Sequence, residues 1–143
     1  MKVPRSLYLD LLSRPYAEGG ASPPSGLCCS GAVLELLVRL GKTVPEGALP
    51  LGQEAVPAHL ADVGAPVSPW ARVGDEPTDA ALHGDVVLQR RTDGTHAVWG
   101  YLGDGDFLTS AKGRGVFEAG ARVLYRPESG TTLGVYRLKG GAR

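Results

Sequence analysis

The sequence predicts an α+β fold in which helices come first and an antiparallel sheet follows. Three observations support this prediction. The chain has 143 residues, the length of one domain, so we expect a single domain over residues 1–143. Apolar residues recur at helical spacing only in the first third, whereas short β-prone runs alternate with turn signals from Gly84 onward. The 21 glycines and 11 prolines also favour short elements joined by many turns.

Two helices are predicted before residue 42. The first is a short amphipathic helix over residues 3–13, which carries Leu7, Leu11 and Leu12 near helical spacing and is stopped by Pro15. The second begins at Cys28 and Cys29 and stops near Gly41. Its buried face is predicted to consist of Ala32, Val33, Leu36, Leu37 and Leu40.

Residues 42–82 contain six prolines, which leave room only for short helices such as one over residues 53–62. Because Leu51, Val56, Leu60 and Trp70 need to be buried, we interpret this segment as wrapped against the domain. The strands are then predicted at residues 84–91, 95–102, 106–110, 114–117, 121–125 and 132–137. Turn signals such as Asp93-Gly94 and Gly103-Asp-Gly105 separate several of them, so the sheet should be antiparallel.

The charge is balanced, with fifteen basic and fifteen acidic residues. This balance argues against nucleic acid or an anionic membrane as a partner. No segment approaches the ~20 apolar residues of a membrane span, and Asp10 interrupts the opening apolar stretch before it could act as a signal peptide. The sequence therefore predicts synthesis in the cytoplasm without a membrane span.

Both cysteines of the chain, Cys28 and Cys29, are adjacent and follow a loop rich in Gly, Pro and Ser. Adjacent cysteines form only a strained disulfide, and two cysteines without a further Cys or His pair at close spacing make a poor structural zinc site. A buried thiol and a nucleophile remain as alternatives. At a helix start, backbone N–H groups and the macrodipole would lower the pKa of a thiol, which favours a nucleophile.

A cysteine nucleophile needs a base, and the chain has three histidines. His59 and His83 lie in or beside the proline-rich segment, whereas His96 lies on a predicted strand just after a hairpin turn. His96 is the best candidate base, although a histidine on a strand is more often a hydrogen-bonded core or surface residue. Arg90, Arg91 and Arg114 are interpreted as a solvated strand edge, and Trp70, Trp99, Tyr101 and Phe107 as core.

Several ordered blocks resemble the NlpC-type cell-wall cysteine peptidases. The segment over residues 15–33, with Tyr16-Ala-Glu-Gly-Gly and then Leu27-Cys-Cys-Ser-Gly-Ala-Val33, is similar to that family's Pro-Tyr-x-x-Gly-Gly and Asp-Cys-Ser-Gly-Leu-Val. Gly84-Asp-Val-Val, Gly94-Thr-His-Ala-Val and Gly113-Arg-Gly-Val116 then match further family blocks in order. The resemblance covers most of the chain, and Leu133-Gly-Val-Tyr-Arg137 also resembles versions from bacteriophage tails.

The resemblance implies a papain-like fold in which the nucleophile helix packs on an antiparallel sheet. By position, Cys29 would be the nucleophile and His96 the general base and acid. Tyr16 and Ser30 would lie near the oxyanion or substrate. The implied reaction is hydrolysis of amide bonds in peptidoglycan stem peptides through a thioester, without a metal or other cofactor.

Two positions depart from the family pattern. Cys28 replaces the aspartate that usually precedes the nucleophile, and Thr109 falls at the third polar position, which is often His, Asn or Gln. A threonine hydroxyl carries no charge to stabilise an imidazolium, so catalysis could be slow, or Ser110 could supply the partner of His96 instead.

The leading hypothesis is therefore a peptidoglycan endopeptidase of a phage tail tip, made in the host cytoplasm and delivered by the virion. Its expected partners are stem peptides and phage tail proteins. The second hypothesis is a weakly active or inactive papain-like module with a structural or binding role in the tail tip. A third is an amidase or acyltransferase of the same fold.

Overall fold

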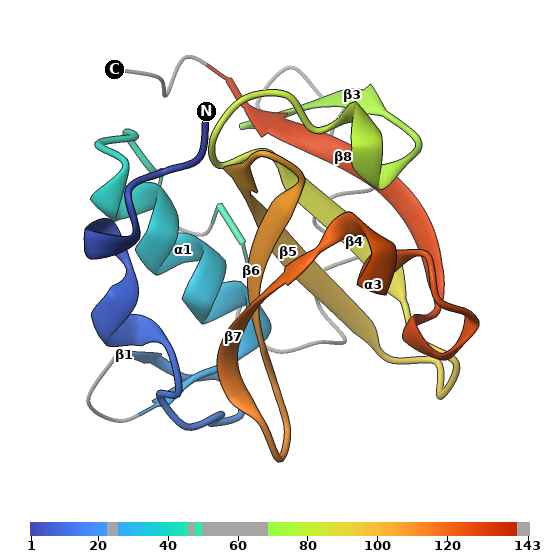
Figure 1. Cartoon of the computed structure of the whole chain (residues 1–143), viewed down its shortest axis with the longest axis horizontal. Helices are drawn as coiled ribbons and strands as arrows, with labels where there is room; N and C mark the ends of the chain where they lie inside the picture. Colours follow the sequence, from blue (N-terminus) through green and yellow to red (C-terminus); the bar gives the residue numbers. More distant parts are fainter. Residues whose placement is uncertain (23–25, 46–47, 50–68, 140–143) are drawn as a thin grey trace.

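The computed structural model describes residues 1–22, 26–45, 48–49 and 69–139. A six-stranded antiparallel sheet with the order β3-β8-β4-β5-β6-β7 forms its centre. The helix α1 (Cys29–Arg39) lies against β5 and β6, as Figure 1 shows. The strands are β3 (Trp70–Gly74), β4 (Val86–Arg90), β5 (His96–Gly103), β6 (Asp106–Ala111), β7 (Gly115–Gly120) and β8 (Thr131–Leu138). The predicted α+β class is confirmed.

The helix α1 forms where its apolar periodicity predicts it. Seven of its eleven residues are buried, and the chain turns into a left-handed conformation at Gly41 (φ 78°) just after the helix ends. Gly100 on β5 lets the helix approach the sheet closely, because a Cβ there would lie 2.9 Å from Leu36 Cδ2. The nucleophile helix predicted from the sequence is thus held directly on the central strands.

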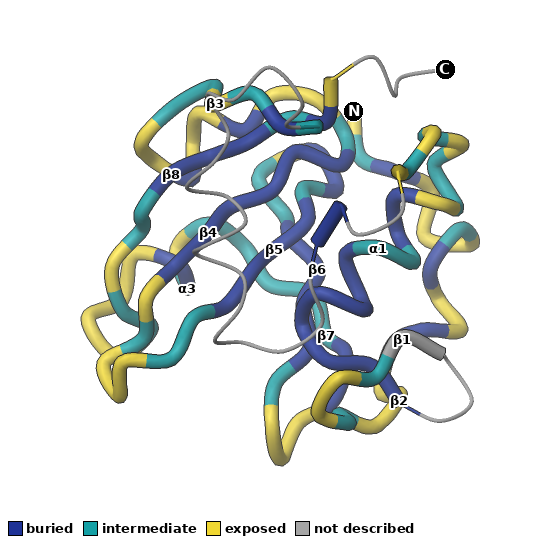
Figure 2. The backbone as a smooth tube through the Cα atoms, turned by 180° about the vertical axis from the view of Figure 1, so that it is seen from behind, coloured by how far each residue is buried: buried dark blue, intermediate teal, exposed yellow. Residues whose placement is uncertain are grey.

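The sheet has a different apolar cluster on each face. On the face that carries α1, residues of the helix such as Val33 pack with Val86, Val98 and Trp70. On the other face, Trp99, Phe107 and Val135 pack with Leu124 of the short helix α3 (Ala121–Leu124). Figure 2 shows that most residues of the central strands β4 and β5 are buried between these layers.

The N-terminal segment forms two 3₁₀ helices, Arg5–Leu7 and Leu9–Leu11, where the sequence predicted one α-helix over residues 3–13. Backbone hydrogen bonds to the sheet at both ends of the segment replace the predicted continuous α-helix. Val3 N–H donates to Leu102 O (2.6 Å), and Ser13 N–H donates to Val116 O (2.8 Å). Tyr8 and Leu11 are fully buried, three residues apart as a 3₁₀ turn requires.

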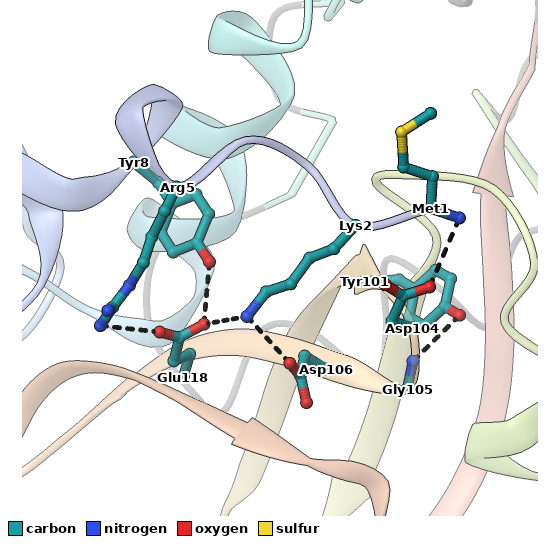
Figure 3. A network of polar contacts seen from close by, with 9 residues as sticks. All are labelled: Met1, Lys2, Arg5, Tyr8, Tyr101, Asp104, Gly105, Asp106 and Glu118. Atoms are coloured by element: carbon teal, nitrogen blue, oxygen red, sulfur yellow. Dashed lines mark hydrogen bonds and ion pairs between the residues drawn. The ribbon is translucent and has the colours of Figure 1, made fainter.

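A cluster of charged side chains fastens this segment to β6 and β7 (Figure 3). The carboxylate of Glu118 accepts hydrogen bonds from Lys2 Nζ and Tyr8 Oη, both at 2.8 Å, and lies 3.0 Å from Arg5 Nη2. Lys2 Nζ also lies 2.9 Å from Asp106 Oδ2. The chain terminus is thereby drawn over the sheet beside α1.

Other predictions need correction. The strand predicted over residues 121–125 is instead the short helix α3 with Tyr125 as its C-cap, because β7 is the edge of the sheet and the turn of helix places Leu124 in the core. The strand β3 was not predicted, since its partner β8 lies more than sixty residues away in the sequence. The helix predicted over residues 53–62 lies outside the described residues. Among the described residues, no helix has the length and apolar character needed to cross a bilayer.

Candidate active site

The chain before α1 is held by a small two-stranded ladder, β1 (Ala21–Ser22) with β2 (Gly26–Leu27). Leu27 N–H donates to Pro15 O and Cys28 N–H donates to Gly20 O, both at 3.0 Å. Gly20 must be glycine here, because a Cβ would collide with the carbonyl oxygen of Gly26. The loop thus places the Tyr16 segment beside the start of α1.

Cys28 is the N-cap of α1, and its Sγ accepts a hydrogen bond from Gly31 N–H at 3.3 Å. Asparagine, aspartate and serine are the residues that most often accept this bond. Cys28 is fully buried and makes no disulfide with Cys29, since both thiols are free. This contact shows what Cys28 does at this position: it caps the helix.

Cys29 is the first residue of α1 and is 0 % exposed. Burial raises the pKa of the Cys29 thiol, and a hydrogen bond to the backbone of Val98 and the charge of Arg91 only partly oppose this. The sequence predicted a lowered pKa from the position at the helix start; that prediction is wrong because the loss of solvation is the larger effect. The resting thiol is therefore protonated at neutral pH.

His96 begins β5, two residues before Val98. Val98 packs in the cluster that contains Cys29, and Gly100 faces Val33 and Leu36 of α1. Because side chains alternate along a strand, His96 lies on this same α1 face. The fold thus brings the predicted nucleophile and base to one end of β5.

The imidazole of His96 is partly buried. Burial lowers its pKa, and the positive charge of Arg90, its cross-strand partner on β4, lowers it further. His96 is therefore neutral at pH 7, the form that can accept a proton from a thiol. The resting pair consists of a neutral thiol and a neutral imidazole.

Thr109 lies on β6, but its hydroxyl is not directed at His96. Thr109 Oγ1 donates to Val98 O at 2.7 Å, and its partner Phe117 on β7 belongs to the cluster on the opposite face. Ser110 lies on the α1 face, and its Oγ donates to Leu27 O at 2.7 Å. The geometry gives no support for either hydroxyl as the partner of His96, and the catalytic role of Thr109 stays a prediction.

Tyr16 and Ser30 are both close to Cys29, in different ways. Tyr16 Oη donates to Glu18 Oε1 at 2.8 Å, and burial followed by this bond raises the pKa of Tyr16. Charge on Cys29 or Cys28 would act on Tyr16, so Tyr16 lies within electrostatic reach of both thiols. The Ser30 hydroxyl is buried without a hydrogen-bond acceptor or donor among the described residues, yet it lies near enough to the Cys29 thiol to help stabilise a thiolate.

The described part of the chain has two open cavities, one beside Tyr16 and one on the sheet face opposite α1. One, of about 450 Å³, is lined by Tyr16, Pro15 and the β6–β7 hairpin residues Lys112 to Gly115. The other, of about 240 Å³, is lined by residues that include Arg91, Trp99, Arg114 and Phe117. Sequence analysis had assigned Arg91 and Arg114 to a solvated strand edge; only the fold brings them together. Within the described ranges, no three His, Cys, Asp or Glu side chains gather as a metal site would require.

No protein-family model matches this sequence, and a search of curated proteins also finds no match. Solved structures do match. The NlpC/p60 domain of the peptidoglycan hydrolase SagA superposes with a TM-score of 0.56 at 19% identity, over 93% of this chain and 94% of that one.

The chain has the NlpC/p60 fold.

Two longer proteins support the same conclusion. An NLP/P60 family protein similar to lipoprotein from Staphylococcus aureus gives a TM-score of 0.59 at 20% identity, over 93% of this chain. An NlpC/p60 family protein from Bacillus cereus gives 0.57 at 20% identity, over 96% of this chain. This chain spans only 39% and 41% of those two proteins. The predicted papain-like, NlpC-type fold is confirmed.

Proposed function

We propose that this protein is a cysteine peptidase that hydrolyses amide bonds in peptidoglycan stem peptides. The observation that carries the proposal is the placement of Cys29 and His96. On an NlpC/p60 fold, the thiol lies at the start of the central helix and the imidazole on the facing side of β5. SagA, whose domain has this fold, is a peptidoglycan hydrolase by name.

The chemistry follows from the neutral resting pair. His96 accepts the thiol proton as Cys29 Sγ attacks the scissile carbonyl carbon, and the N–H groups at the start of α1 donate to the developing oxyanion. The imidazolium then protonates the leaving amine as the C–N bond breaks and a thioester forms. Water, deprotonated by His96, attacks the thioester, and the thiol regains its proton as the acid product leaves.

Cleavage of purified peptidoglycan, read out by mass spectrometry of released fragments, tests this proposal. We expect Cys29→Ala to abolish fragment release. The matched control is Cys28→Ser, which keeps a side-chain acceptor for Gly31 N–H and should retain most of the activity. Fragment release by Cys29→Ala at the wild-type rate would contradict the proposal, and the product masses would distinguish hydrolysis from transfer to another acyl acceptor.

A second candidate function is a binding or structural module with little turnover. It is favoured by the complete burial of Cys29 and by the hydrogen bond that the Thr109 hydroxyl donates to Val98 O. Alkylation of Cys29 no faster than that of a free thiol, together with stable binding of peptidoglycan and no released fragments, would support this function.

We also propose that the protein acts within a phage tail. The support is the likeness of Leu133-Gly-Val-Tyr-Arg137 to tail-associated sequences. These residues lie in β8, where Val135 and Tyr136 are buried and Arg137 pairs with Asp85, so packing alone also accounts for them. Detection of the protein in purified virions, by mass spectrometry of tails, tests the proposal; its absence from them would overturn it.

A further inference from the structure

The cavity of about 240 Å³ lies behind the sheet, on the face opposite α1, and the proposed peptidase reaction does not use it. Its lining includes Trp99 of β5 and Phe117 of β7, which belong to the apolar cluster of that face. Val123 of α3 and Ser129 of the 3₁₀ helix Pro127–Ser129 also line it. This rear cavity is therefore formed jointly by the sheet and by the segment that follows β7.

Hydrogen bonds fix the walls of the rear cavity. Gln89 is 1% exposed; its Oε1 accepts from Trp99 Nε1 at 2.9 Å, and its Nε2 donates to Leu124 O at 2.8 Å. This buried amide joins the sheet to α3. Ser129 Oγ donates to Val123 O at 2.7 Å, which holds the 3₁₀ helix against α3. The cavity is thus preformed, and a preformed site costs a ligand less ordering entropy.

Two guanidinium groups from separate turns line this same cavity. Arg91 directly follows β4 and, by strand alternation, lies on the same face as Gln89. Arg114 comes from the β6–β7 turn, and its guanidinium carbon lies 3.7 Å from the centre of the Phe117 ring. A stacked guanidinium keeps its N–H groups in the plane of the group, where they can still donate to a ligand.

Several other described cations also lack a salt bridge, so an unpaired charge alone would mean little. Arg91 and Arg114 differ because they line one cavity whose aromatic wall is fixed. Glu128 is the acidic residue of that lining, and it is exposed. Two positive groups and one negative group leave the lining with a net positive charge, which favours an anionic ligand.

The size and the apolar wall of the rear cavity narrow the ligand further. Its volume is somewhat below the roughly 300–1,000 Å³ of pockets that hold drug-sized molecules, so the cavity suits a smaller ligand. Trp99 and Val123 offer apolar surface for the body of such a ligand. Guanidinium groups recognise a carboxylate by charge-assisted hydrogen bonds.

We propose that the rear cavity binds a small apolar carboxylate, with the carboxylate at Arg91 and Arg114 and the apolar body against Trp99 and Val123. A free organic acid and the C-terminal residue of a peptide share this chemistry. The site lies across the sheet from Cys29, so it does not depend on the proposed peptidase activity.

A titration followed by NMR tests the proposal. The probes are N-acetyl-leucine and its uncharged analogue N-acetyl-leucinamide, each added to the ¹⁵N-labelled protein. We expect N-acetyl-leucine to shift the backbone amides of Ala111, Phe117 and Ser129 saturably, and to leave that of Val33 in α1 in place. The amide probe should bind at least roughly fivefold more weakly, because it lacks the charge.

A third probe, N-acetyl-Gly-Gly-Leu, distinguishes the two sources of the carboxylate. Tighter binding than that of N-acetyl-leucine would support the C-terminus of a peptide as the ligand. Equal or weaker binding of this peptide, beside saturable binding of N-acetyl-leucine, would support a free acid.

The double variant Arg91→Gln and Arg114→Gln should weaken binding of N-acetyl-leucine roughly tenfold and leave that of the amide probe unchanged. The matched control is Arg90→Gln. It removes the same charge from the neighbouring position, but Arg90 is the cross-strand partner of His96 and lies on the α1 face. Amide spectra that keep the wild-type dispersion show that each variant folds.

Equal affinity for the acid and the amide, or no saturable shifts with the acid, would overturn the proposal. A loss in Arg90→Gln as large as that in the double variant would also overturn it. Shifts confined to α1 and the Tyr16 loop would do the same, because they would place binding at the candidate active site. None of these outcomes bears on cleavage of peptidoglycan, which is measured separately.

Discussion

The electrostatic setting of His96 is the residue-scale feature that most constrains the proposed catalysis. In many catalytic triads a carboxylate stabilises the imidazolium. Here Arg90 lies across from His96 on β4, and its positive charge opposes protonation. The site therefore favours the neutral imidazole and makes the imidazolium of the first step costly.

This arrangement predicts a pH dependence. Burial first, and then Arg90, lower the pKa of His96 below its ordinary value of 6.5, so a base that must be neutral stays active below that pH. Arg90→Gln removes the repulsion, which raises the pKa and should move the acid limb of kcat/KM to higher pH.

The measurement is kcat/KM against pH for the wild type and Arg90→Gln on one stem peptide. Arg126→Gln, which removes an exposed cation outside the site, is the control and should leave the profile in place. An acid limb that stays fixed in Arg90→Gln would show that His96 does not govern it.

At the scale of elements, the junction of α1, β5 and β6 decides the shape of the site. The β5–β6 ladder pairs Gly100 with Leu108 and Tyr101 with Phe107 next to the hairpin. Toward the start of β5, Val98 O accepts a hydrogen bond from the Thr109 side chain, and Val98 packs in the same apolar cluster as Cys29. Thr109 thus supports the strand segment against which the thiol rests.

The N-terminal segment is a second element whose position depends on few contacts. Burial alone would raise the pKa of Glu118, but hydrogen bonds from Lys2 and Tyr8 outweigh it, and the pKa is lowered. Because the pKa of Glu118 is lower in the folded state, its carboxylate stabilises the fold fully when the pH is above the unfolded-state pKa of about 4.5. This stabilisation is lost as the pH falls through the folded-state pKa.

We therefore predict that Glu118→Gln lowers the free energy of unfolding at pH 7 by about 1–2 kcal/mol, allowing for partial exposure of the cluster. The difference from wild type should shrink as the pH is lowered below about 4. Urea unfolding at several pH values measures both quantities. Glu128→Gln is the exposed control, and an equal loss at pH 7 and pH 3 would contradict the assignment.

At the scale of the whole molecule, Asp85 joins two segments that are distant in sequence, the turn over residues 81–85 and β8. Its buried carboxylate accepts from Ala81 N–H and Leu82 N–H, both at 3.0 Å, and pairs with Arg137 Nε and Nη2 at 2.9 and 2.8 Å. Arg137 lies on β8, which separates β3 from β4. The pair therefore fixes the C-terminal strand in the sheet that carries His96.

Removing the Asp85 carboxylate should leave the partly buried Arg137 guanidinium and the N–H groups of Ala81 and Leu82 without their acceptor. Asp85→Ala is expected to lower the free energy of unfolding by about 3 kcal/mol, because both the bidentate pair and the two backbone bonds are lost. Asp85→Asn retains an acceptor for the backbone and should lose less. Thermal and urea unfolding measure the series, with exposed Asp75→Asn as the control. A loss below that of Asp75→Asn would contradict the role.

The sequence by itself determined the elements whose signals are local. The periodicity from Ala32 to Leu40 predicted α1, the Gly-containing turns predicted the β5–β6 and β6–β7 hairpins, and the ordered motifs predicted the NlpC-type fold. These predictions succeeded because side-chain spacing and turn chemistry act within a few residues. They also selected Cys29 and His96 as the proposed nucleophile and base.

The tertiary structure decided everything that depends on pairing across the chain. Only the packing of α1 on β5 shows that burial raises the pKa of Cys29 by more than the position at the helix start lowers it. Only the register of β6 directs the Thr109 hydroxyl toward Val98 O. The gathering of Arg91 with Arg114, the insertion of β8 beside β4 and the turn of α3 likewise follow from long-range contacts. The physical reason is that desolvation, electrostatic coupling and strand register are properties of neighbours in space, which a linear pattern does not specify.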